Sequence, residues 1–251
     1  MRIDYPAEDH LPQLRRLWKE AFGDTEDFLE VFFTDVFTSD RCRCVTEDGQ
    51  VAGALYWLDC SAQGKPMAYL YAVATRKACR GKGICRSLMA DTHALLRELG
   101  YAGCLLVPGE QALFQMYSSM GYRTCSQMQE FTCRSGDTPL PIRKLSAPEY
   151  AALRQQYLPE GGVIQEGENL IFLEKLMDLY AGEGFLFCAD TADGQVFCPE
   201  LLGNADAAAG IVSALNASGG RFRIPGKGKD FAMYFPLSDT PAPAYFGLAF
   251  D

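Results

Sequence analysis

The sequence predicts an α/β (α+β) fold in which a mixed, mostly antiparallel sheet is flanked by helices and followed by a second, smaller α/β lobe. Three observations support this fold class. The first half holds apolar segments of strand-like composition separated by turn signals. A loop rich in glycine and cations then joins a strand to an amphipathic helix. The second half also mixes helices and strands but lacks that loop. With 251 residues, 48% of them hydrophobic, the chain can bury a full core in one or two domains.

The N-terminal segment is expected to form a short strand and two helices. Met1–Tyr5 is the predicted strand, and Glu8 and Asp9 are expected to open the first helix. Apolar residues recur on one face of that helix at Leu11, Leu14, Leu17, Trp18 and Phe22. The second helix carries an aromatic stripe, expected to be core or the wall of an acceptor site, at Phe28, Leu29, Phe32, Phe33 and Phe37.

Three strands are predicted next, at Arg41–Thr46, Val51–Asp59 and Met67–Thr75. The turn signal Asp48-Gly49 separates the first two, so an antiparallel run is expected. A further buried strand is predicted at Ala102–Val107.

Two helices belong to this first half. The longer one is predicted from about Gly81 to Leu99, because leucines recur on one side and Gly100 is a favoured left-handed residue after a helix. A shorter helix is predicted at Glu110–Met120, followed by Gly121 and a last strand.

The start of the longer helix has the composition of a pyrophosphate site. A helix start leaves backbone N–H groups without partners and carries a partial positive charge, so an anion there satisfies both. Gly81 and Gly83 would let phosphate oxygens approach the amides. In a chain of net charge −9, five cations fall within eleven residues, which are Arg76, Lys77, Arg80, Lys82 and Arg86. A solvated basic turn is the alternative interpretation.

Two other nucleotide-binding loops do not match this junction. A P-loop needs Gly-x-x-x-x-Gly-Lys followed by Ser or Thr, and a dinucleotide fold needs Gly-x-Gly-x-x-Gly. The sequence instead has Arg80-x-x-Gly83-x-Cys85 and, further along, Tyr117-Ser118-Ser119-Met120-Gly121-Tyr122.

These two segments resemble the acyl-CoA-binding motif and the tyrosine motif of the GNAT superfamily of N-acetyltransferases. The family's first motif reads Arg or Gln, two residues, Gly, one residue, then Gly or Ala. Its second reads Tyr, three residues, Gly, then an aromatic residue. The resemblance covers roughly residues 1–133. Cys85 departs from the small Gly or Ala of the family, which is expected to alter packing against the cofactor without abolishing binding.

The resemblance implies that the strands at Met67–Thr75 and Ala102–Val107 splay apart and that the pantetheine arm of acetyl-CoA lies between them. Backbone groups of Val73 and Thr75 are then expected to bind the pantetheine. The remaining cofactor-binding residues hold the pyrophosphate through their amides and are Arg80, Gly81, Lys82, Gly83, Ile84 and Cys85.

Tyr117 is the predicted catalytic residue, because it occupies the family's position for the donor to the departing thiolate. A phenol donates hydrogen bonds at neutral pH. The alternative is an ordinary tyrosine that closes the core with Phe114 and Met120. By the same resemblance, the backbone N–H of Val73 is expected to stabilise the oxyanion.

A general base is harder to assign. The Met67–Thr75 strand has no Asp or Glu, and His93 is expected on the polar, solvent-facing side of its helix. Asp59 and Glu110 are weak candidates, so the amine is expected to arrive neutral or to lose its proton through water.

The second half is predicted to follow a linker at Pro139-Leu140-Pro141. Its helices are expected at Ala147–Tyr157, Asn169–Tyr180 and Asp206–Leu215, and its strands at Phe185–Ala189, Gln195–Pro199, Gly220–Pro225, Phe231–Pro236 and Tyr245–Phe250. Gly226-Lys227-Gly228-Lys229 is expected to be a hairpin turn, because it lies between two strands.

This half resembles the degenerate acetyltransferase lobe of enhanced-intracellular-survival-type proteins. The resemblance divides the chain into a GNAT domain at 1–134 and an accessory domain at 140–251. In that group the terminal carboxylate reaches the active site, which makes Asp251 a further candidate base. A solvated terminus is the alternative.

Charge and composition exclude several classes. Residues 1–134 have a net charge of −2 and residues 135–251 of −7, which argues against a nucleic-acid partner. The acidic half either attracts a cationic amine or reflects solubility. Apolar stretches are too short for a bilayer and the N-terminus lacks a signal peptide, so no membrane association and a cytoplasmic location are expected.

The ten cysteines are expected to be mostly buried, reduced thiols, because the chain has no Cys-x-x-Cys pair and is large enough to fold without disulfides. Cys79 and Cys85, beside the cationic loop, are the predicted reactive ones. The two histidines do not lie at ligand spacing from the cysteines, so no metal site is predicted.

The sequence therefore predicts an N-acetyltransferase that transfers an acetyl group from acetyl-CoA to a primary amine by direct attack. The acceptor would be a small molecule or a peptide. A CoA-binding or interaction module without turnover is the alternative, and the chain would act as a monomer or a homo-oligomer.

Overall fold

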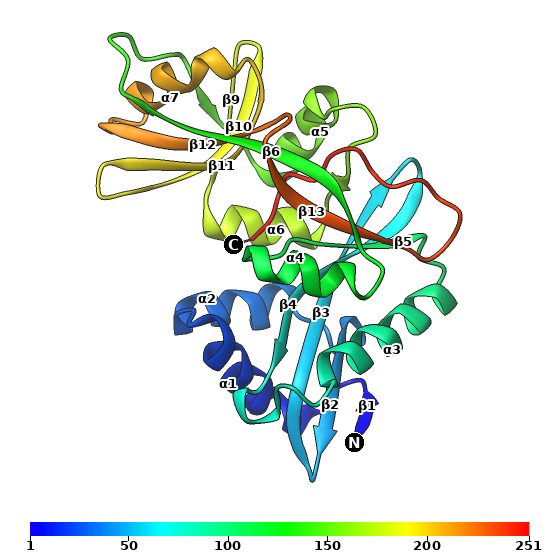
Figure 1. The fold of residues 1–251 in the computed structure, drawn as a ribbon. Coiled ribbons are helices and arrows are strands. Elements are labelled where there is room, and N and C mark those ends of the chain that lie inside the picture. The colour runs from blue at the N-terminus through cyan, green and yellow to red at the C-terminus, as the bar shows by residue number, and fades with distance from the viewer. Residues whose placement is uncertain (251) are drawn as a thin grey trace.

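A single sheet runs through residues 1–250, which are the residues that this computed structural model describes (Figure 1). Its strands are β1 (Arg2–Asp4), β2 (Cys42–Glu47), β3 (Gln50–Ala62), β4 (Lys65–Thr75), β5 (Gly103–Leu106), β6 (Arg123–Arg134), β7 (Arg143–Lys144), β8 (Ile164–Gln165), β9 (Asp178–Gly182), β10 (Phe185–Ala192), β11 (Gln195–Gly203), β12 (Gly219–Pro225) and β13 (Lys229–Pro236). Their spatial order is β1-β2-β3-β4-β5-β13-β6-β12-β11-β10-β9-β7, with β8 paired to β3. The β4–β5 and β11–β12 pairs are parallel and the rest antiparallel, which confirms the predicted mixed sheet.

Helices cover both faces of the sheet. They are α1 (Leu11–Phe22), α2 (Glu26–Val31), α3 (Ile84–Glu98), α4 (Gln111–Ser118), α5 (Ala147–Tyr157), α6 (Glu168–Leu176) and α7 (Ala208–Ala214). In the first half, α1 and α2 pack on one face, and α3 packs on the other. No helix within residues 1–250 has both the length and the apolar composition needed to cross a bilayer.

Trp18 is the centre of the core under α1 and α2. It is 2% exposed, and its ring lies 4.5 Å from that of Phe32 and 5.2 Å from that of Tyr56. Phe33 and Leu29 are buried beside it. Most of the predicted aromatic stripe is therefore core, as expected for apolar side chains at helical spacing.

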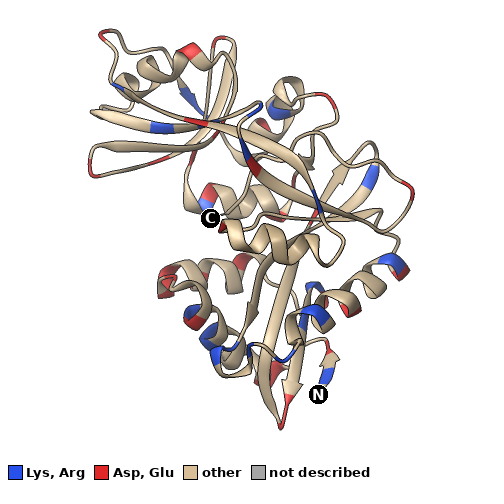
Figure 2. Cartoon of the chain, viewed as in Figure 1, with Lys and Arg blue, Asp and Glu red and all other residues tan. Residues whose placement is uncertain are grey.

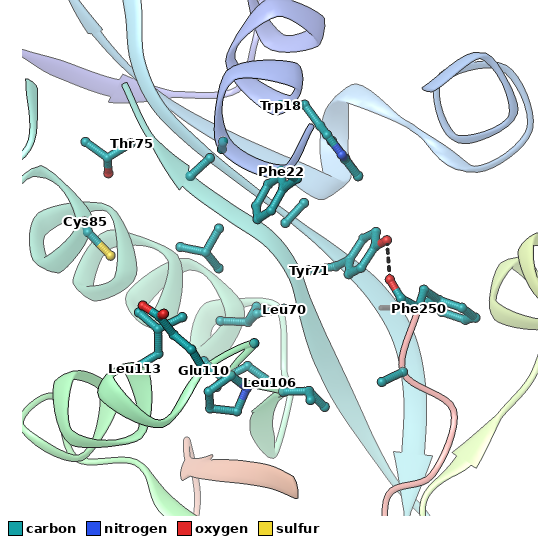
Figure 3. A pocket seen from close by; sticks show the side chains of 18 of the residues that line it. Trp18, Phe22, Leu70, Tyr71, Thr75, Cys85, Leu106, Glu110, Leu113 and Phe250 are labelled. Carbon is teal, nitrogen blue, oxygen red and sulfur yellow. Dashed lines mark hydrogen bonds between the residues drawn. The ribbon is translucent and has the colours of Figure 1, made fainter. Parts of the chain in front are cut away.

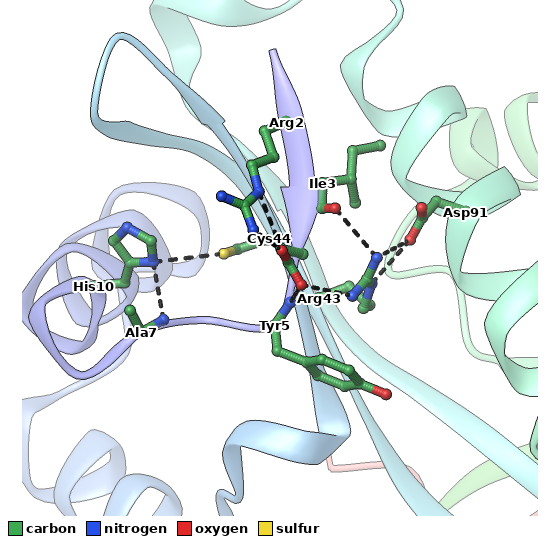
Figure 4. Close-up of polar contacts among 9 residues, drawn as sticks. Arg2, Ile3, Tyr5, Ala7, His10, Arg43, Cys44 and Asp91 are labelled. Carbon is green, nitrogen blue, oxygen red and sulfur yellow. Dashed lines mark hydrogen bonds and ion pairs between the residues drawn. The ribbon is translucent and has the colours of Figure 1, made fainter.

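A buried arginine on β2 links β1 to α3 through hydrogen bonds and an ion pair. Arg43, on β2, is 8% exposed, and its Nε and Nη2 lie 2.8 Å and 2.6 Å from a carboxylate oxygen of Asp91 on α3 (Figure 4). It also donates to the carbonyl of Ile3, and its guanidinium lies 4.9 Å from the ring centre of Tyr5. A charge buried in this way requires partners, and the structure supplies them from β1 and α3.

The predicted splay between β4 and β5 is present. The two strands pair only from Met67 with Gly103 to Tyr69 with Leu105, and then separate. Further along β4, Leu55 of β3 faces two residues instead of one, because Tyr56 pairs with Tyr71 and Ala54 with Ala74. Such a bulge bends a strand and interrupts its ladder.

The two halves of the chain interleave in the sheet. β13, from the second half, lies between β5 and β6, and β6 in turn pairs with β12. A turn is present at 226–229, since β12 ends at Pro225 and β13 begins at Lys229. The prediction that it closes a hairpin is wrong, because β12 and β13 do not pair with each other and β6 lies between them. Two further helices, α5 and α7, also agree with expectation.

One predicted helix is wrong in its second part. The segment Asn169–Tyr180 was expected to be helical throughout, but α6 ends at Leu176 and β9 begins at Asp178. Met177 already has extended backbone angles. β9 then pairs with β10 and β7 through the backbone groups that a longer helix would have used internally, so tertiary pairing overrides helical propensity.

The predicted strand at Tyr245–Phe250 is also wrong. This C-terminal segment makes one isolated bridge, between Tyr245 and Gly162. Side chains take the place of a neighbouring strand. Ser126 accepts from the amide of Phe246 at 3.1 Å, and Gln165 both accepts from the amide and donates to the carbonyl of Leu248 at 3.2 Å and 2.7 Å. Buried backbone groups are thus satisfied without a ladder.

Candidate active site

One large cavity lies where β4 and β5 separate (Figure 3). Its volume is about 1150 Å³. The first half supplies α1, β4, the start of α3 and α4, and the second half supplies the end of α6, parts of β10 and β11, and the C-terminal segment. The strand separation predicted from the sequence is therefore the floor of a cavity built by both halves.

The glycine loop forms one end of this cavity. Gly81 and Gly83 have φ of +76° and +78°, a left-handed conformation that other residues adopt at a cost. Gly83 is the residue before α3, and no side chain caps the first amides of that helix. A Cβ placed on either glycine would meet no atom within 4 Å, so the space over the amides is open to an anion.

The cations of this loop divide into two groups. Arg80 and Arg86 line the cavity. Arg80 donates to the carbonyl of Thr75 at 3.2 Å, and Arg86 donates to the carbonyl and hydroxyl of Ser119 just after α4. Lys82 lies outside the cavity lining, with its Nζ 4.0 Å from a carboxylate oxygen of Glu47. Figure 2 shows basic residues in the loop that leads into α3 and at the start of that helix.

The other predicted cofactor residues also lie on the cavity. Ile84 and Cys85 begin α3 and line it, and Val73 and Thr75 line it from β4. Val73 and Thr75 stand beyond the last pair with β5, on an edge of β4 that no strand within residues 1–250 covers. An uncovered strand edge offers backbone donors and acceptors to an extended ligand.

Cys85 is not activated by its cationic neighbours. Burial raises the pKa of this thiol above its ordinary value, and Arg86 only partly opposes that shift. Less thiolate is present at neutral pH than in a free cysteine, so the cationic loop does not activate this thiol. That Cys79 and Cys85 are the more reactive of the ten cysteines stays a prediction. None of the ten cysteines is in a disulfide and seven are buried, as the sequence predicted for most of them.

Tyr117 lies on α4 with its side chain on the cavity. It is 6% exposed, and burial raises the pKa of its phenol well above the ordinary value, with the nearby Cys85 adding to the shift. The hydroxyl makes no hydrogen bond within the part of the chain that the structure describes. Tyr117 is therefore a protonated donor whose hydroxyl is available to a ligand.

Neither Asp59, a weak candidate base, nor His93 lines the cavity. Asp59 lies outside the cavity lining, accepts a hydrogen bond from Tyr101 and lies 3.7 Å from Arg41. His93 is not on the surface as expected. It is 7% exposed, its Nε2 lies 2.7 Å from the hydroxyl of Tyr122, and its ring stacks on Phe235 at 4.0 Å.

Within residues 1–250, three carboxylates line the cavity. Glu110, the residue before α4, was a candidate from the sequence. Asp24 and Asp190 were missed. Asp24 follows the glycine that ends α1 and accepts from the indole of Trp18 at 2.7 Å, a local contact that sequence spacing could have indicated. Asp190 follows a bulge in β10, and no sequence signal places it here. Asp251 lies outside the described residues.

The family comparison agrees with this geometry. A family model described as the acetyltransferase (GNAT) domain matches residues 2–125. This half of the chain therefore resembles a GNAT acetyltransferase domain. The family and the fold together support an acyltransferase activity. A comparison with curated protein sequences gives no match.

Solved structures resemble nearly the whole chain, including the second half. A GCN5-related N-acetyltransferase from Anabaena variabilis has a TM-score of 0.73 at 14% identity, covering 94% of this chain and 73% of that chain. One from Kribbella flavida has a TM-score of 0.69 at 18% identity, covering 94% and 72%. Eis1 from Mycobacterium abscessus has a TM-score of 0.65 at 13% identity, covering 94% and 74%. These likenesses confirm the predicted GNAT fold and its resemblance to Eis-type proteins.

Proposed function

We propose that this protein is an N-acetyltransferase that transfers the acetyl group of acetyl-CoA to a primary amine by direct attack. One observation supports this most strongly. A single cavity joins the uncapped amides at the start of α3, the uncovered edge of β4 and the protonated hydroxyl of Tyr117. These are the groups that a diphosphate, a pantetheine arm and a departing thiolate would need.

Different residues of the cavity would bind different parts of acetyl-CoA. The amides from Arg80 to Cys85 would hold the diphosphate, and Val73 and Thr75 would bind the pantetheine through their backbone. The bulge in β4 supports a further role for Val73. Ala72 has a φ of +48°, a strained angle for a residue with a side chain, and it ends regular pairing beside Val73. The N–H of Val73 would then stabilise the oxyanion.

The reaction is balanced with these residues and water. The amine nitrogen forms a bond to the thioester carbon, and the carbon–sulfur bond breaks. Tyr117 donates its proton to the leaving sulfur, which departs as the thiol, and the phenol regains a proton from water. The amine gives up its proton to water or to a carboxylate that lines the cavity. Among these carboxylates, Glu110 is the residue directly before α4, the helix that carries Tyr117.

A CoA-binding module without turnover is the second candidate. Cys85 stands where the family has Gly or Ala, and neither Asp59 nor His93 is placed to act as a base. Both candidates predict cofactor binding, so binding alone does not separate them.

Release of free CoA thiol tests the proposal. The protein is mixed with acetyl-CoA and a panel of amines, polyamines, aminoglycosides, amino acids and peptides, and thiol is followed with a chromogenic reagent. Amine-dependent release is expected. Calorimetric binding of acetyl-CoA without release by any acceptor would instead favour the module.

The second half has a place in this proposal as a wall of the acceptor pocket, because Met177, Asp190, Phe197 and Phe250 all line the cavity. The domain ranges 1–134 and 140–251, the cytoplasmic location and the oligomeric state stay predictions.

A further inference from the structure

The side of the cavity away from α3 is almost entirely apolar. α1 and α2 contribute Trp18, Phe22 and Phe28, and the second half contributes Met177, Phe197 and Phe250. Figure 3 shows Trp18 and Phe22 on one side of β4 and Phe250 beyond Tyr71. Three segments far apart in the sequence therefore converge on one aromatic surface, which we call the aromatic wall.

The rings that the first half and Phe250 contribute to this wall form a continuous chain of contacts, whereas Phe197 packs against the guanidiniums of Arg221 and Arg223 at 4.6 Å and 5.2 Å. Trp18 lies 5.8 Å from Phe22 and 6.2 Å from Phe28. Phe28 lies 5.5 Å from the buried ring of Phe172, which lies 4.9 Å from Phe250. Edge-to-face and tilted contacts of this kind hold rings in fixed orientations. The aromatic wall is thus a preformed surface that need not be ordered by a ligand.

Part of the wall is left uncovered by the protein itself. Phe22 is 47% exposed, and Phe28, Met177 and Phe197 are partly exposed. Among the large apolar side chains that are exposed within residues 1–250, Phe22 is the one that lines the cavity. Uncovered apolar surface inside a concave site is the usual feature of a small-molecule pocket.

The polar groups on this side are few and mostly engaged. One oxygen of Asp24 accepts from Trp18, and one oxygen of Asp190 accepts from the amide of Thr191. The hydroxyl of Tyr71 donates to the carbonyl of Phe250 at 2.8 Å. An acceptor with many hydroxyl or amino groups would lose hydrogen bonds to water here without replacing them, which costs free energy for each group.

We propose that the acceptor is a monoamine whose amino group is attached to an aromatic or large apolar body. This rests on the proposed acyl transfer, because it assigns the acceptor of that reaction. The body packs on the aromatic wall, and the amino group lies toward Val73 and Tyr117. The oxygens of Asp24 and Asp190 that accept no hydrogen bond within residues 1–250 attract the amine in its cationic form before it loses a proton.

A matched pair of amines tests the proposal. Ethylamine and 2-phenylethylamine differ by one phenyl ring, and burial of that ring on the wall is expected to raise kcat/KM at least tenfold. Spermidine and an aminoglycoside are expected to be poorer acceptors than 2-phenylethylamine. Equal or higher kcat/KM for ethylamine, spermidine or the aminoglycoside would overturn the assignment, while thiol release itself would still support acyl transfer.

A binding measurement keeps the proposal testable if no amine is acetylated. The protein is saturated with CoA and titrated with each of the two amines by calorimetry. Tighter binding of 2-phenylethylamine would support the aromatic wall as a ligand site even though the acyltransferase had failed. No difference between the two amines would overturn it.

Two variants locate the binding surface. Phe22→Ala is expected to raise KM for 2-phenylethylamine about tenfold and to leave KM for acetyl-CoA unchanged. Leu99→Ala is the matched control, because Leu99 is also an exposed apolar residue, at 54%, but lies outside the cavity lining. An unchanged KM for 2-phenylethylamine in Phe22→Ala would contradict the proposal.

Discussion

Tyr117 shows how position and burial combine at the scale of one residue. Its motif predicts its place in the chain, but the motif does not say whether the hydroxyl reaches a ligand. In the structure the ring of Tyr117 is buried on α4, and its hydroxyl has no hydrogen-bond partner within residues 1–250, so the hydroxyl can reach a ligand in the cavity. Burial also raises the pKa of the phenol, so the donor stays protonated throughout the neutral range.

Tyr117→Phe is therefore expected to lower kcat by about 100-fold, because general-acid assistance to the leaving thiolate is lost. KM for acetyl-CoA should change little, since the ring still fills its place. Steady-state kinetics with a good acceptor measures both constants. Tyr101→Phe is the control, because it removes a hydroxyl that contacts Asp59 outside the cavity. Full kcat in Tyr117→Phe would show that another group assists the sulfur.

His93 shows where sequence reasoning fails for a single residue. Helical periodicity put it on the polar face of α3, yet Phe235 of β13 comes from the second half and covers that face. No pattern within α3 could reveal a strand that joins from more than a hundred residues away. The consequence is a buried imidazole against Tyr122.

This burial predicts how stability depends on pH. Burial, with a smaller contribution from Arg97, lowers the pKa of His93 from 6.5 to about 4. Between these values the unfolded chain binds a proton that the folded chain does not, so the free energy of unfolding falls as the pH drops below 6.5. From pH 7.5 to 5.0 the loss due to His93 is about 2 kcal/mol.

Urea unfolding at several pH values measures this loss. In His93→Gln the part of the slope due to the imidazole should disappear, whereas His10→Gln should keep it, since His10 is the other histidine and lies apart from Tyr122. An identical pH slope in His93→Gln and the unaltered protein would refute the assignment.

At the scale of elements, the sequence predicts best what is local. The glycine loop, the periodicity of α3 and the turns between β2, β3 and β4 are all encoded within a few residues, and the structure has them. The break between α6 and β9 and the course of the C-terminal segment depend on partners elsewhere. Gln165 and Ser126 replace a neighbouring strand for that segment, and side chains that do this leave no periodic pattern in the sequence.

The start of α3 gives a prediction for an element. Gly83→Asp is expected to weaken acetyl-CoA binding by at least about 100-fold, because a carboxylate would occupy the open space over the amides and repel the diphosphate. Calorimetry measures the affinity.

Gly184→Asp is the matched control for the backbone strain. Gly184 has a φ of +79° against +78° for Gly83, and a Cβ at either position meets no atom within 4 Å. Gly184 turns between β9 and β10, away from the cavity lining. Both variants should lose similar stability, but only Gly83→Asp should lose binding. Equal affinities would show that the cofactor does not lie on these amides.

At the scale of the molecule, the cavity exists because the two halves share one sheet. β13 fills the place between β5 and β6, and the C-terminal segment then crosses back to bring Ala249 and Phe250 onto the cavity. The sequence indicated a second lobe of mixed helices and strands, but it could not show this interleaving. Strand order between distant segments is set by packing that only the whole chain completes.

A buried ion pair secures that arrangement. Arg154 of α5 and Glu200 of β11 are 2% and 0% exposed, and the guanidinium donates to both carboxylate oxygens at 2.7 Å and 2.9 Å. Tyr245, at the start of the C-terminal segment, donates to the same carboxylate at 2.8 Å. Glu200 thus links the second half to the segment that ends on the cavity.

Glu200→Gln is expected to cost about 3 to 5 kcal/mol in the free energy of unfolding, because it leaves the guanidinium of Arg154 buried without a counter-charge. Urea unfolding measures the cost. Glu30→Gln is the control, since its ion pair with Arg15 is exposed and should contribute at most about 1 kcal/mol.

Amide hydrogen exchange over residues 245–250 should also become faster in Glu200→Gln alone, and KM for the acceptor should rise as Phe250 loses its fixed position. Stability within 1 kcal/mol of the unaltered protein would mean that the packing of the C-terminal segment does not depend on this pair.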